Sequence, residues 1–225
     1  MKRGLFVVFE GTEKGGKKTQ SQMLADALTQ ISGKETLFIH FPDKSTPVGK
    51  LIEKYLSGQL KLGPHEVHLL FTANRWERQK DISDALSVGI NVVTDRYSYS
   101  NIAYTAASIH PLSNADWAWC RQMEEGLLQP DVIFCLTPTD FHEITAREGF
   151  GQRASETPSF QSQVLRHYAR LCSEMEAEQK DSSQGGDGVS EKSEPRPKLW
   201  NWIQATGQAV DDIHNCVMAI IDPLL

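Results

Sequence analysis

The sequence predicts an α/β fold of three layers, in which helices flank a central parallel sheet of five strands. Short apolar runs of strand length alternate along the chain with longer segments whose apolar residues recur every three or four positions. A strand that follows another strand through a helix runs parallel to it, and the helices then cover both faces of the sheet. A glycine-rich loop also joins the first apolar run to the first helical segment.

The N-terminal half begins with the nearly continuous apolar run at residues 5–9, which is typical of a strand buried on both faces. The helical segment that follows ends near Gly33, because glycine favours the end of a helix. The remaining expected elements of this half are strands at residues 36–41 and 90–94 and helices at 48–55 and 66–86.

The C-terminal half continues the alternation. A helix follows Tyr97, and the later elements are strands at 132–136 and 199–205 and helices at 160–178 and 210–221. Residues 181–198 interrupt this order, because they are rich in Ser, Gly, Glu, Lys and Pro and hold almost no large apolar side chains. Such a segment cannot bury enough surface to offset its ordering entropy, so we expect a flexible surface insert.

The length of 225 residues and the ordinary composition indicate one domain over residues 1–225. The formal net charge of −6 argues against nucleic acid and anionic membranes as partners, since both favour a basic surface.

No apolar run approaches the roughly 20 residues that span a bilayer, and no cleavable signal pattern is present. We expect a cytoplasmic protein, with nuclear and organellar compartments left open. The scattered cysteines indicate neither a disulfide framework nor a zinc site.

The loop from Gly11 to Thr19 reads GTEKGGKKT. Phosphate loops contain a glycine, four further residues, and then Gly-Lys-Ser or Gly-Lys-Thr, and Gly11, Gly16 and Lys17 fit this pattern. Their backbone N–H groups surround phosphate oxygens, and the lysine spans the β- and γ-phosphates. The pattern predicts a P-loop NTPase fold; the alternative is a plain glycine-rich turn with solvated lysines. The residues expected to bind ATP here are Gly11, Gly15, Gly16, Lys17, Lys18 and Thr19.

Lys18 departs from the pattern. A serine or threonine at this position normally serves as a magnesium ligand, and a lysine ammonium has no lone pair to offer a cation. Three interpretations stay open. Lys18 swings away and Mg²⁺ is held by water, Thr19 and a distant carboxylate; or Lys18 supplies charge itself; or the site is impaired.

Three further segments are specific, namely residues 41–46 (FPDKST), 68–77 (HLLFTANRWE) and 95–100 (DRYSYS). Together with the phosphate loop they make the chain resemble the thymidylate kinase family from Gly4 to near Ile221, outside the insert. The resemblance implies transfer of the γ-phosphoryl group of ATP to dTMP, with Mg²⁺ as cofactor, no covalent intermediate and a homodimer as the assembly.

The resemblance places the Phe71 ring under thymine and lets Arg75 read the base. Aromatic rings stack on any base, and a guanidinium can donate to a pyrimidine carbonyl oxygen. Considered without the family, Phe71 is a candidate for core packing and Arg75 for a solvated helix face. The resemblance further places Phe41 and Pro42 in the wall of the dTMP pocket.

Two cations are expected to hold the acceptor phosphate, namely Arg96 and Lys44, which stands where the family usually has an arginine. Taken alone, Lys44 is more typical of a solvated loop lysine. Asp95 ends a strand at the ligand-binding edge of the sheet and is expected to hold the metal through water, or else to cap the next helix. The remaining residues that the resemblance places near dTMP are Glu13, Asn101, Tyr104 and Gln161.

Residues 139–157 resemble the family's lid, because 146–153 (AREGFGQR) combine arginines with glycines that permit closure. Arg147 is expected on the adenine side. Some family members carry a catalytic arginine in the phosphate loop; Lys14 has that position here and lacks the bidentate fork, so Arg153 takes more of the catalytic role. Ala205 and Thr206 are expected to cradle adenine with their backbone, unless they form a plain turn.

The expected catalytic residues are therefore Lys17, Arg96, Arg153, Glu13 and Lys14. Two alternative functions stay open: Lys14 and Lys18 together also fit a catalytically weak nucleotide-binding protein, and related kinases act on other monophosphates or on nucleosides. Lys44 and Arg96 favour an acceptor that already carries a phosphate.

Overall fold

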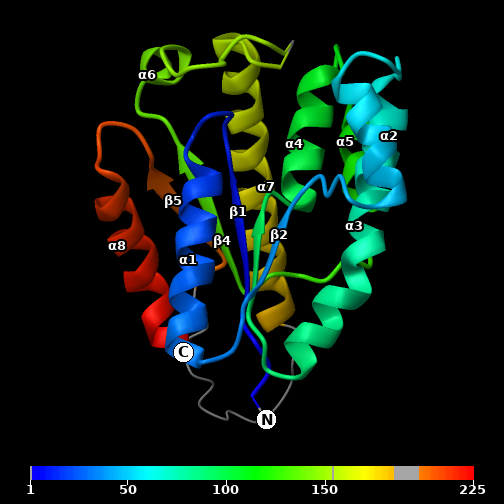
Figure 1. The fold of residues 1–225 in the computed structure, drawn as a ribbon. Coiled ribbons are helices and arrows are strands. Elements are labelled where there is room, and N and C mark those ends of the chain that lie inside the picture. Colours follow the sequence, from blue (N-terminus) through cyan, green and yellow to red (C-terminus); the bar gives the residue numbers. More distant parts are fainter. Residues whose placement is uncertain (1, 154, 185–197) are drawn as a thin grey trace.

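The computed structural model describes residues 2–153, 155–184 and 198–225. It contains a parallel sheet of five strands in the order β2-β3-β1-β4-β5, which confirms the predicted fold class (Figure 1). The strands are β1 (Phe6–Gly11), β2 (Leu37–His40), β3 (Val92–Asp95), β4 (Val132–Thr137) and β5 (Trp200–Gln204). The helices are α1 (Lys17–Ser32), α2 (Pro47–Leu56), α3 (Pro64–Ser87), α4 (Ser98–Ser108), α5 (Asn114–Gln122), α6 (Phe141–Thr145), α7 (Pro158–Gln184) and α8 (Val210–Ile221), followed by the 3₁₀ turn η1 (Asp222–Leu224).

Two apolar cores lie on opposite faces of the sheet, because successive side chains of a strand point to opposite sides. In β1, Phe6 and Val8 join the core formed with α3, α4, α5 and α7. Val7 and Phe9 join the core formed with α1 and α8. Figure 1 shows α1 and α8 together on one side and α7, α4 and α3 on the other. The helices thus complete the three layers that the alternating sequence predicted.

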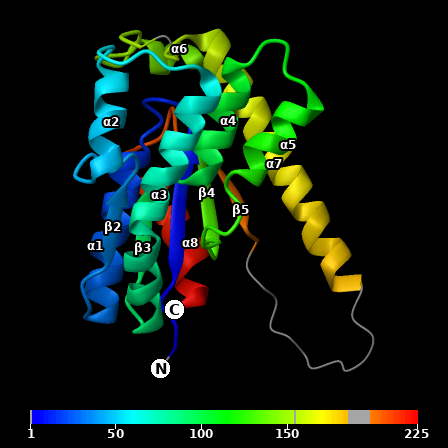
Figure 2. The same cartoon turned by 90° about the vertical axis from the view of Figure 1, so that its right-hand side faces the viewer.

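The carboxyl ends of the strands meet at one edge of the sheet. Phe9 is in register with Asp95, and Gly11 is in register with Leu136. The loops that follow β1, β3, β4 and β5 therefore come together at this edge, and α6 lies above it (Figures 1 and 2). Register alone brings the predicted phosphate loop, Asp95 and the predicted lid into one place.

The structure differs from the sequence prediction mainly at element ends. Helix α7 continues to Gln184, since its Glu, Gln, Lys and Ala residues favour a helix. Residues 181–184 of the expected flexible insert therefore belong to this helix, and residues 185–197 lie outside the described parts of the chain. The sequence prediction did not include α5 and α6. Within the described residues, every helix is too short or too polar to cross a membrane.

Candidate active site

The phosphate loop has the conformation that its glycines allow. Gly11 has a φ of 132°, and a Cβ atom there would lie 2.0 Å from the carbonyl oxygen of Leu136. Only glycine fits this position. Gly16, with a φ of 85°, comes directly before α1, so the free N–H groups of the first helical turn point toward the loop. Loop and helix terminus together form a site suited to an anion.

Lys17 is buried at the first position of α1. Its Nζ donates a hydrogen bond of 2.5 Å to the carbonyl oxygen of Thr12. Burial and the nearby Arg96 guanidinium lower the pKa of Lys17 to about 8, although the carboxylates of Glu13 and Asp95 oppose this shift. The phosphates of a bound nucleotide would add negative charge beside the ammonium and stabilise its protonated form.

Lys18 and Thr19 are both exposed in the first turn of α1. The backbone carbonyl of Lys18 accepts a hydrogen bond of 3.1 Å from the Ser21 hydroxyl. Within the described parts of the chain, no hydrogen bond or ion pair holds the Lys18 ammonium. This exposed position agrees with the interpretation in which Lys18 swings away from the loop.

Arg96 and Glu13 form an ion pair in which Nη2 and Oε1 are 2.9 Å apart, and only 15% and 17% of their side chains are exposed. Arg96 also donates hydrogen bonds of 3.2 Å to the Ser100 hydroxyl and 3.5 Å to the Tyr104 hydroxyl. Burial raises the pKa of Glu13, but Arg96 and Lys17 outweigh it and hold this pKa below its ordinary value. The pair is therefore ionised on both sides and joins the phosphate loop to the end of β3.

Asp95, the last residue of β3, is almost fully buried. Its Oδ2 lies 2.8 Å from Nδ1 of His40, and its Oδ1 is buried without a partner among the described residues. Burial raises the pKa of Asp95, but the hydrogen bond from His40 and the charge of Lys17 outweigh it and lower this pKa. Asp95 is thus an ionised carboxylate with one oxygen left for a ligand.

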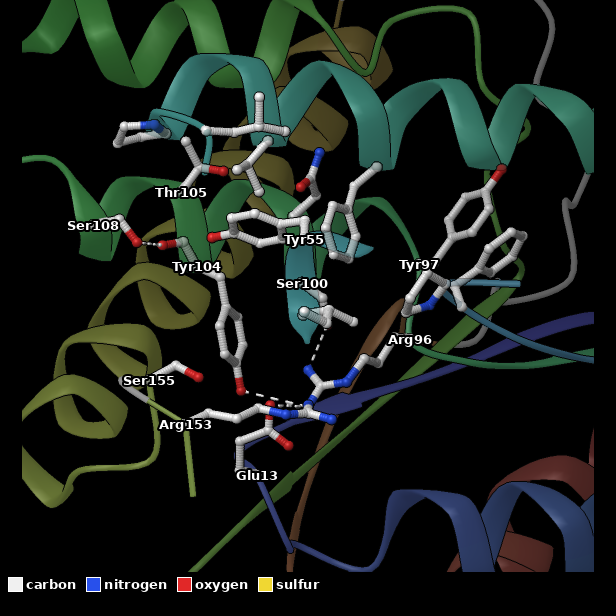
Figure 3. A pocket seen from close by; sticks show the side chains of 18 of the residues that line it. Glu13, Tyr55, Arg96, Tyr97, Ser100, Tyr104, Thr105, Ser108, Arg153 and Ser155 are labelled. Atoms are coloured by element: carbon white, nitrogen blue, oxygen red, sulfur yellow. Dashed lines mark hydrogen bonds and ion pairs between the residues drawn. The ribbon is translucent and has the colours of Figure 1, made fainter. Parts of the chain in front are cut away.

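A cavity of about 250 Å³ opens beside the Arg96–Glu13 pair. Arg153 and Tyr104 converge with these two residues at the polar end of the cavity, and Ser155 lies nearby (Figure 3). The apolar side chains of the wall include Phe41, Pro42, Tyr55, Leu62, Val67 and Phe71. An apolar cavity with a cationic end suits a flat ring that carries an anionic group.

Arg75 is buried and lines this cavity, so the alternative of a solvated helix face is wrong. Its Nε and Nη2 donate hydrogen bonds of 3.0 and 2.5 Å to the two carboxylate oxygens of Glu124. Asn101 also lines the cavity, and its Nδ2 donates a hydrogen bond of 2.7 Å to the same carboxylate. Burial raises the pKa of Glu124, but Arg75 and its other donors outweigh it and lower this pKa to about 2.

The structure does not bring Lys44 to the cavity. Its side chain is half exposed and its Nζ lies 3.2 Å from the carboxylate of Glu53, so it is a surface ion pair. Arg153 instead joins Arg96 at the cationic end. The cations that the structure brings together at this cavity are therefore Arg96 and Arg153, and not the expected Arg96 and Lys44.

Gln161 connects three parts of the site, although it does not belong to the cavity wall. Its Oε1 accepts hydrogen bonds of 2.9 Å from the backbone N–H of Glu13 and 3.3 Å from the Tyr104 hydroxyl. Its Nε2 donates one of 2.7 Å to the carbonyl oxygen of Ser155. The phosphate loop, the cavity wall and the predicted lid are thus linked through one buried amide.

The predicted lid also contacts the phosphate loop through Arg147. Its Nη1 donates to the carbonyl oxygen of Lys14, and its Nη2 lies 3.5 Å from the carbonyl oxygen of Ala205. A Cβ atom built on Gly149 would lie 3.2 Å from Nζ of Lys14. The Lys14 ammonium therefore lies close to the backbone of the predicted lid. Arg147 therefore lies between the phosphate loop and the loop after β5.

The loop after β5 is ordered by side-chain and backbone bonds. The Thr206 hydroxyl accepts a hydrogen bond of 2.8 Å from the backbone N–H of Thr139. The backbone N–H of Gly207 donates one of 3.0 Å to Glu143. Ala205 and Thr206 thus form a tethered loop beside the lid.

Three acidic or basic groups of the site were not predicted from the sequence, and two of them, Glu10 and Glu124, are buried. Glu10 accepts hydrogen bonds of 3.0 Å from the backbone N–H groups of Tyr97 and Ser100, and it thereby caps α4. Burial raises the pKa of Glu10, although the hydrogen bonds from Ser100 and the charge of Arg96 oppose the shift. Glu124 and His40 are the other two. Of these three residues, only Glu10 has a sequence feature that could have indicated a role in the site, because it directly precedes the phosphate loop.

The fold and the site together define a phosphotransferase of the P-loop class, with a phosphate loop on one side and a separate cavity on the other. A family model described as thymidylate kinase matches residues 9–183. Thymidylate kinase of Homo sapiens is 38% identical over 170 residues, which covers 76% of this chain and 77% of that protein. Thymidylate kinase of Plasmodium falciparum is 33% identical over 218 residues and covers 96% of this chain and 89% of that protein.

A solved structure of thymidylate kinase from Candida albicans superposes with a TM-score of 0.78 at 29% identity, and it covers 99% of this chain and 92% of that chain. The chain belongs to the thymidylate kinase family. It is an ATP-dependent nucleoside monophosphate kinase, as the sequence predicted.

The Glu124 carboxylate predicts a specific acid sensitivity of the fold. The pKa of Glu124 is about 2 in the folded protein, and its ordinary value of 4.5 applies to the unfolded chain. The stabilising contribution of the ionised carboxylate is therefore fully present above pH 4.5 and is lost as the pH falls toward 2. We compare the free energy of unfolding of wild type with that of Glu124→Gln. We expect the difference between them to be about 2 kcal/mol smaller at pH 3 than at pH 6. Urea unfolding at each pH measures this difference. The exposed neighbour variant Glu125→Gln is the control, and an equal pH dependence of both variants would contradict the assignment.

Proposed function

We propose that this chain transfers the γ-phosphoryl group of ATP to dTMP, giving dTDP and ADP. The observation that carries this proposal is the position of Arg96. It lies at the cationic end of an otherwise largely apolar cavity and is paired with Glu13 of the phosphate loop. A nucleotide in the cavity would thereby present its phosphate to the donor loop.

On the donor side, the loop N–H groups, the N-terminus of α1 and Lys17 bind the ATP phosphates. Lys17 regains its full charge when the phosphates approach, because an anion within a few ångströms favours the ammonium. On the acceptor side, Arg96 and Arg153 hold the dTMP phosphate, Phe71 stacks on thymine and Arg75 donates to the base. The chain then needs only to align the two phosphates and neutralise charge, so transfer is direct and forms no covalent intermediate.

Magnesium is the cofactor we propose, and the residues present fit it. Asp95 offers an ionised carboxylate whose buried Oδ1 has no partner among the described residues, which suits a metal held through water. Thr19 lies in the first turn of α1 as a further oxygen donor. When bound, Mg²⁺ supplies positive charge to the ATP phosphates. Lys18, which stands where the family usually has a hydroxyl, is exposed, and we propose that water takes the place of that hydroxyl.

We also propose that residues 139–157 act as a lid over both nucleotides. Arg147 and Gln161 support this role, since they connect the segment to the phosphate loop. Closure would exclude water and suppress ATP hydrolysis. We propose that Ala205 and Thr206, in the tethered loop beside Arg147, cradle adenine.

The proposed reaction is tested by assaying ADP formation with ATP and a panel of monophosphates across a magnesium titration. We expect dTMP to be the best acceptor, with activity that depends on Mg²⁺. Lys18→Ser restores the usual hydroxyl and should lower the Mg²⁺ concentration needed for half-maximal rate. An inert wild type beside an active Lys18→Ser would instead establish a catalytically weak nucleotide-binding protein, and a different preferred acceptor would overturn the assignment of dTMP.

We propose that the chain assembles as a homodimer through α3. Leu69 and Trp76 are each 47% exposed and lie seven residues apart, so they share one face of this helix. Exposed apolar residues that cluster on one face are typical of an interface.

Sedimentation equilibrium tests the dimer, with Leu69→Glu expected to shift the protein to monomers because it buries a charge in the apolar contact. Ile31→Glu is the matched control, since Ile31 is 56% exposed on the distant helix α1. A monomeric wild type, or equal dissociation by both variants, would rule out this interface.

We propose the cytoplasm as the site of the reaction. The four cysteines are free thiols, which suits a reducing compartment. Fractionation of the source cells with an antibody to this chain checks the location, and recovery in an organelle would contradict it.

A further inference from the structure

A buried carboxylate lies behind the acceptor cavity, outside the residues to which the proposed reaction assigns a role. Glu124 belongs to the segment between α5 and β4 and is only 5% exposed. Besides the bonds from Arg75 and Asn101, its Oε1 accepts a hydrogen bond of 2.7 Å from the Thr72 hydroxyl. Nε2 of His68 lies 3.3 Å from the same oxygen. Four side chains from α3 and α4 therefore converge on this one group.

An ionised carboxylate is an acceptor only, so each neighbour must turn a donor toward it. This requirement fixes the orientation of the Asn101 amide. Its Nδ2 contacts Glu124, the carbonyl oxygen of His68 and the Thr72 hydroxyl, at 2.7, 3.0 and 3.2 Å. The amide oxygen Oδ1 consequently points away from Glu124.

The same requirement fixes the Arg75 guanidinium, because Nε and Nη2 are both held by Glu124. Among the described residues, no hydrogen bond uses Nη1 of Arg75 or Oδ1 of Asn101, and neither atom is buried without a partner. Both residues line the cavity. Glu124 therefore leaves one donor and one acceptor for a ligand.

We propose that Glu124 is a positioning residue that sets the base specificity of the acceptor site. A donor from Arg75 beside an acceptor from Asn101 matches a pyrimidine with a 4-oxo group and an N3–H, which is the edge of thymine and uracil. Cytosine presents the reverse pattern, an amino donor at position 4 and an acceptor at N3. The site held by Glu124 thus rejects cytosine by leaving polar groups unpaired. This inference rests on the proposed function, because it assumes a pyrimidine monophosphate in the cavity.

The test compares kcat/KM for dTMP, dUMP and dCMP in wild type and in Glu124→Gln. Glutamine keeps the volume of the side chain but lacks the charge, and its amide can turn a donor toward Arg75 and Asn101. Because a hydrogen bond to a charged group contributes roughly 1.5–3 kcal/mol, we expect the dTMP to dCMP ratio to fall about 10- to 100-fold. The loss should arise mainly in KM for dTMP. The dTMP to dUMP ratio and the KM for ATP should stay unchanged, since dUMP shares the recognised edge and ATP binds elsewhere.

Two further variants separate positioning from a merely structural role. Glu124→Asp keeps the charge and should recover part of the discrimination, and Glu125→Gln, an exposed neighbour, should retain all of it. If Glu124→Gln is not recovered as a folded protein, Glu124→Asp decides, because its carboxylate is one methylene shorter, lies further from Nε and Nη2 of Arg75, and should lower the ratio.

The proposal is overturned if kcat/KM for dTMP and dCMP falls by the same factor in Glu124→Gln, or if Glu124→Asp, used in its place, keeps the full ratio. It is also overturned if Glu125→Gln loses as much discrimination. A wild type that phosphorylates none of the three monophosphates would contradict the proposed function and not the role of Glu124, so the two failures are distinguishable.

Discussion

The ion pair between Arg96 and Glu13 is the contact on which the whole site depends. Arg96 belongs to the turn between β3 and α4, and Glu13 belongs to the loop between β1 and α1. The pair forms because β1 and β3 are adjacent and in register, and the backbone N–H of Arg96 donates a hydrogen bond of 2.8 Å to the carbonyl oxygen of Phe9. Glu10, one residue further along β1, caps the helix that follows Arg96. The phosphate loop and the cavity are therefore joined through the sheet itself.

The chemistry of the site follows from burying charges that compensate one another. Burial alone disfavours the charged form of every such group, and close partners of opposite sign offset this cost. Arg96 and Lys17 keep Glu13 ionised, whereas Arg96 also lowers the pKa of Lys17. An arriving phosphate adds negative charge beside both cations. The phosphates of a bound nucleotide would thus supply further negative charge to the buried cations Lys17 and Arg96.

Much of the fold could be predicted from the sequence because periodicity and turn residues act locally. The helix at residues 210–221 has the predicted bounds, and Gly33 ends α1 as expected. Helix α5 was missed although its capping box, Ser113 with Asp116, is a local signal. The strand expected from residue 90 begins at Val92.

The site was less predictable because its contacts join distant parts of the chain. Arg75 and Glu124 are 49 positions apart, so no local pattern revealed that a buried carboxylate holds this guanidinium. The family resemblance predicted Lys44 in the phosphate site, but in the structure Lys44 forms an ion pair at the surface with Glu53 of α2. Family resemblance placed Gln161 near the acceptor, and only the structure shows that it also bonds the phosphate loop.

A crystal structure of the protein with dTMP and a non-hydrolysable ATP analogue tests the central claim most directly. The account predicts the dTMP phosphate within hydrogen-bond distance of the Arg96 guanidinium, facing the terminal phosphate of the analogue beside Lys17, with thymine in the cavity against Phe71. A dTMP phosphate bound away from Arg96, or two phosphates on separate surfaces, would contradict it.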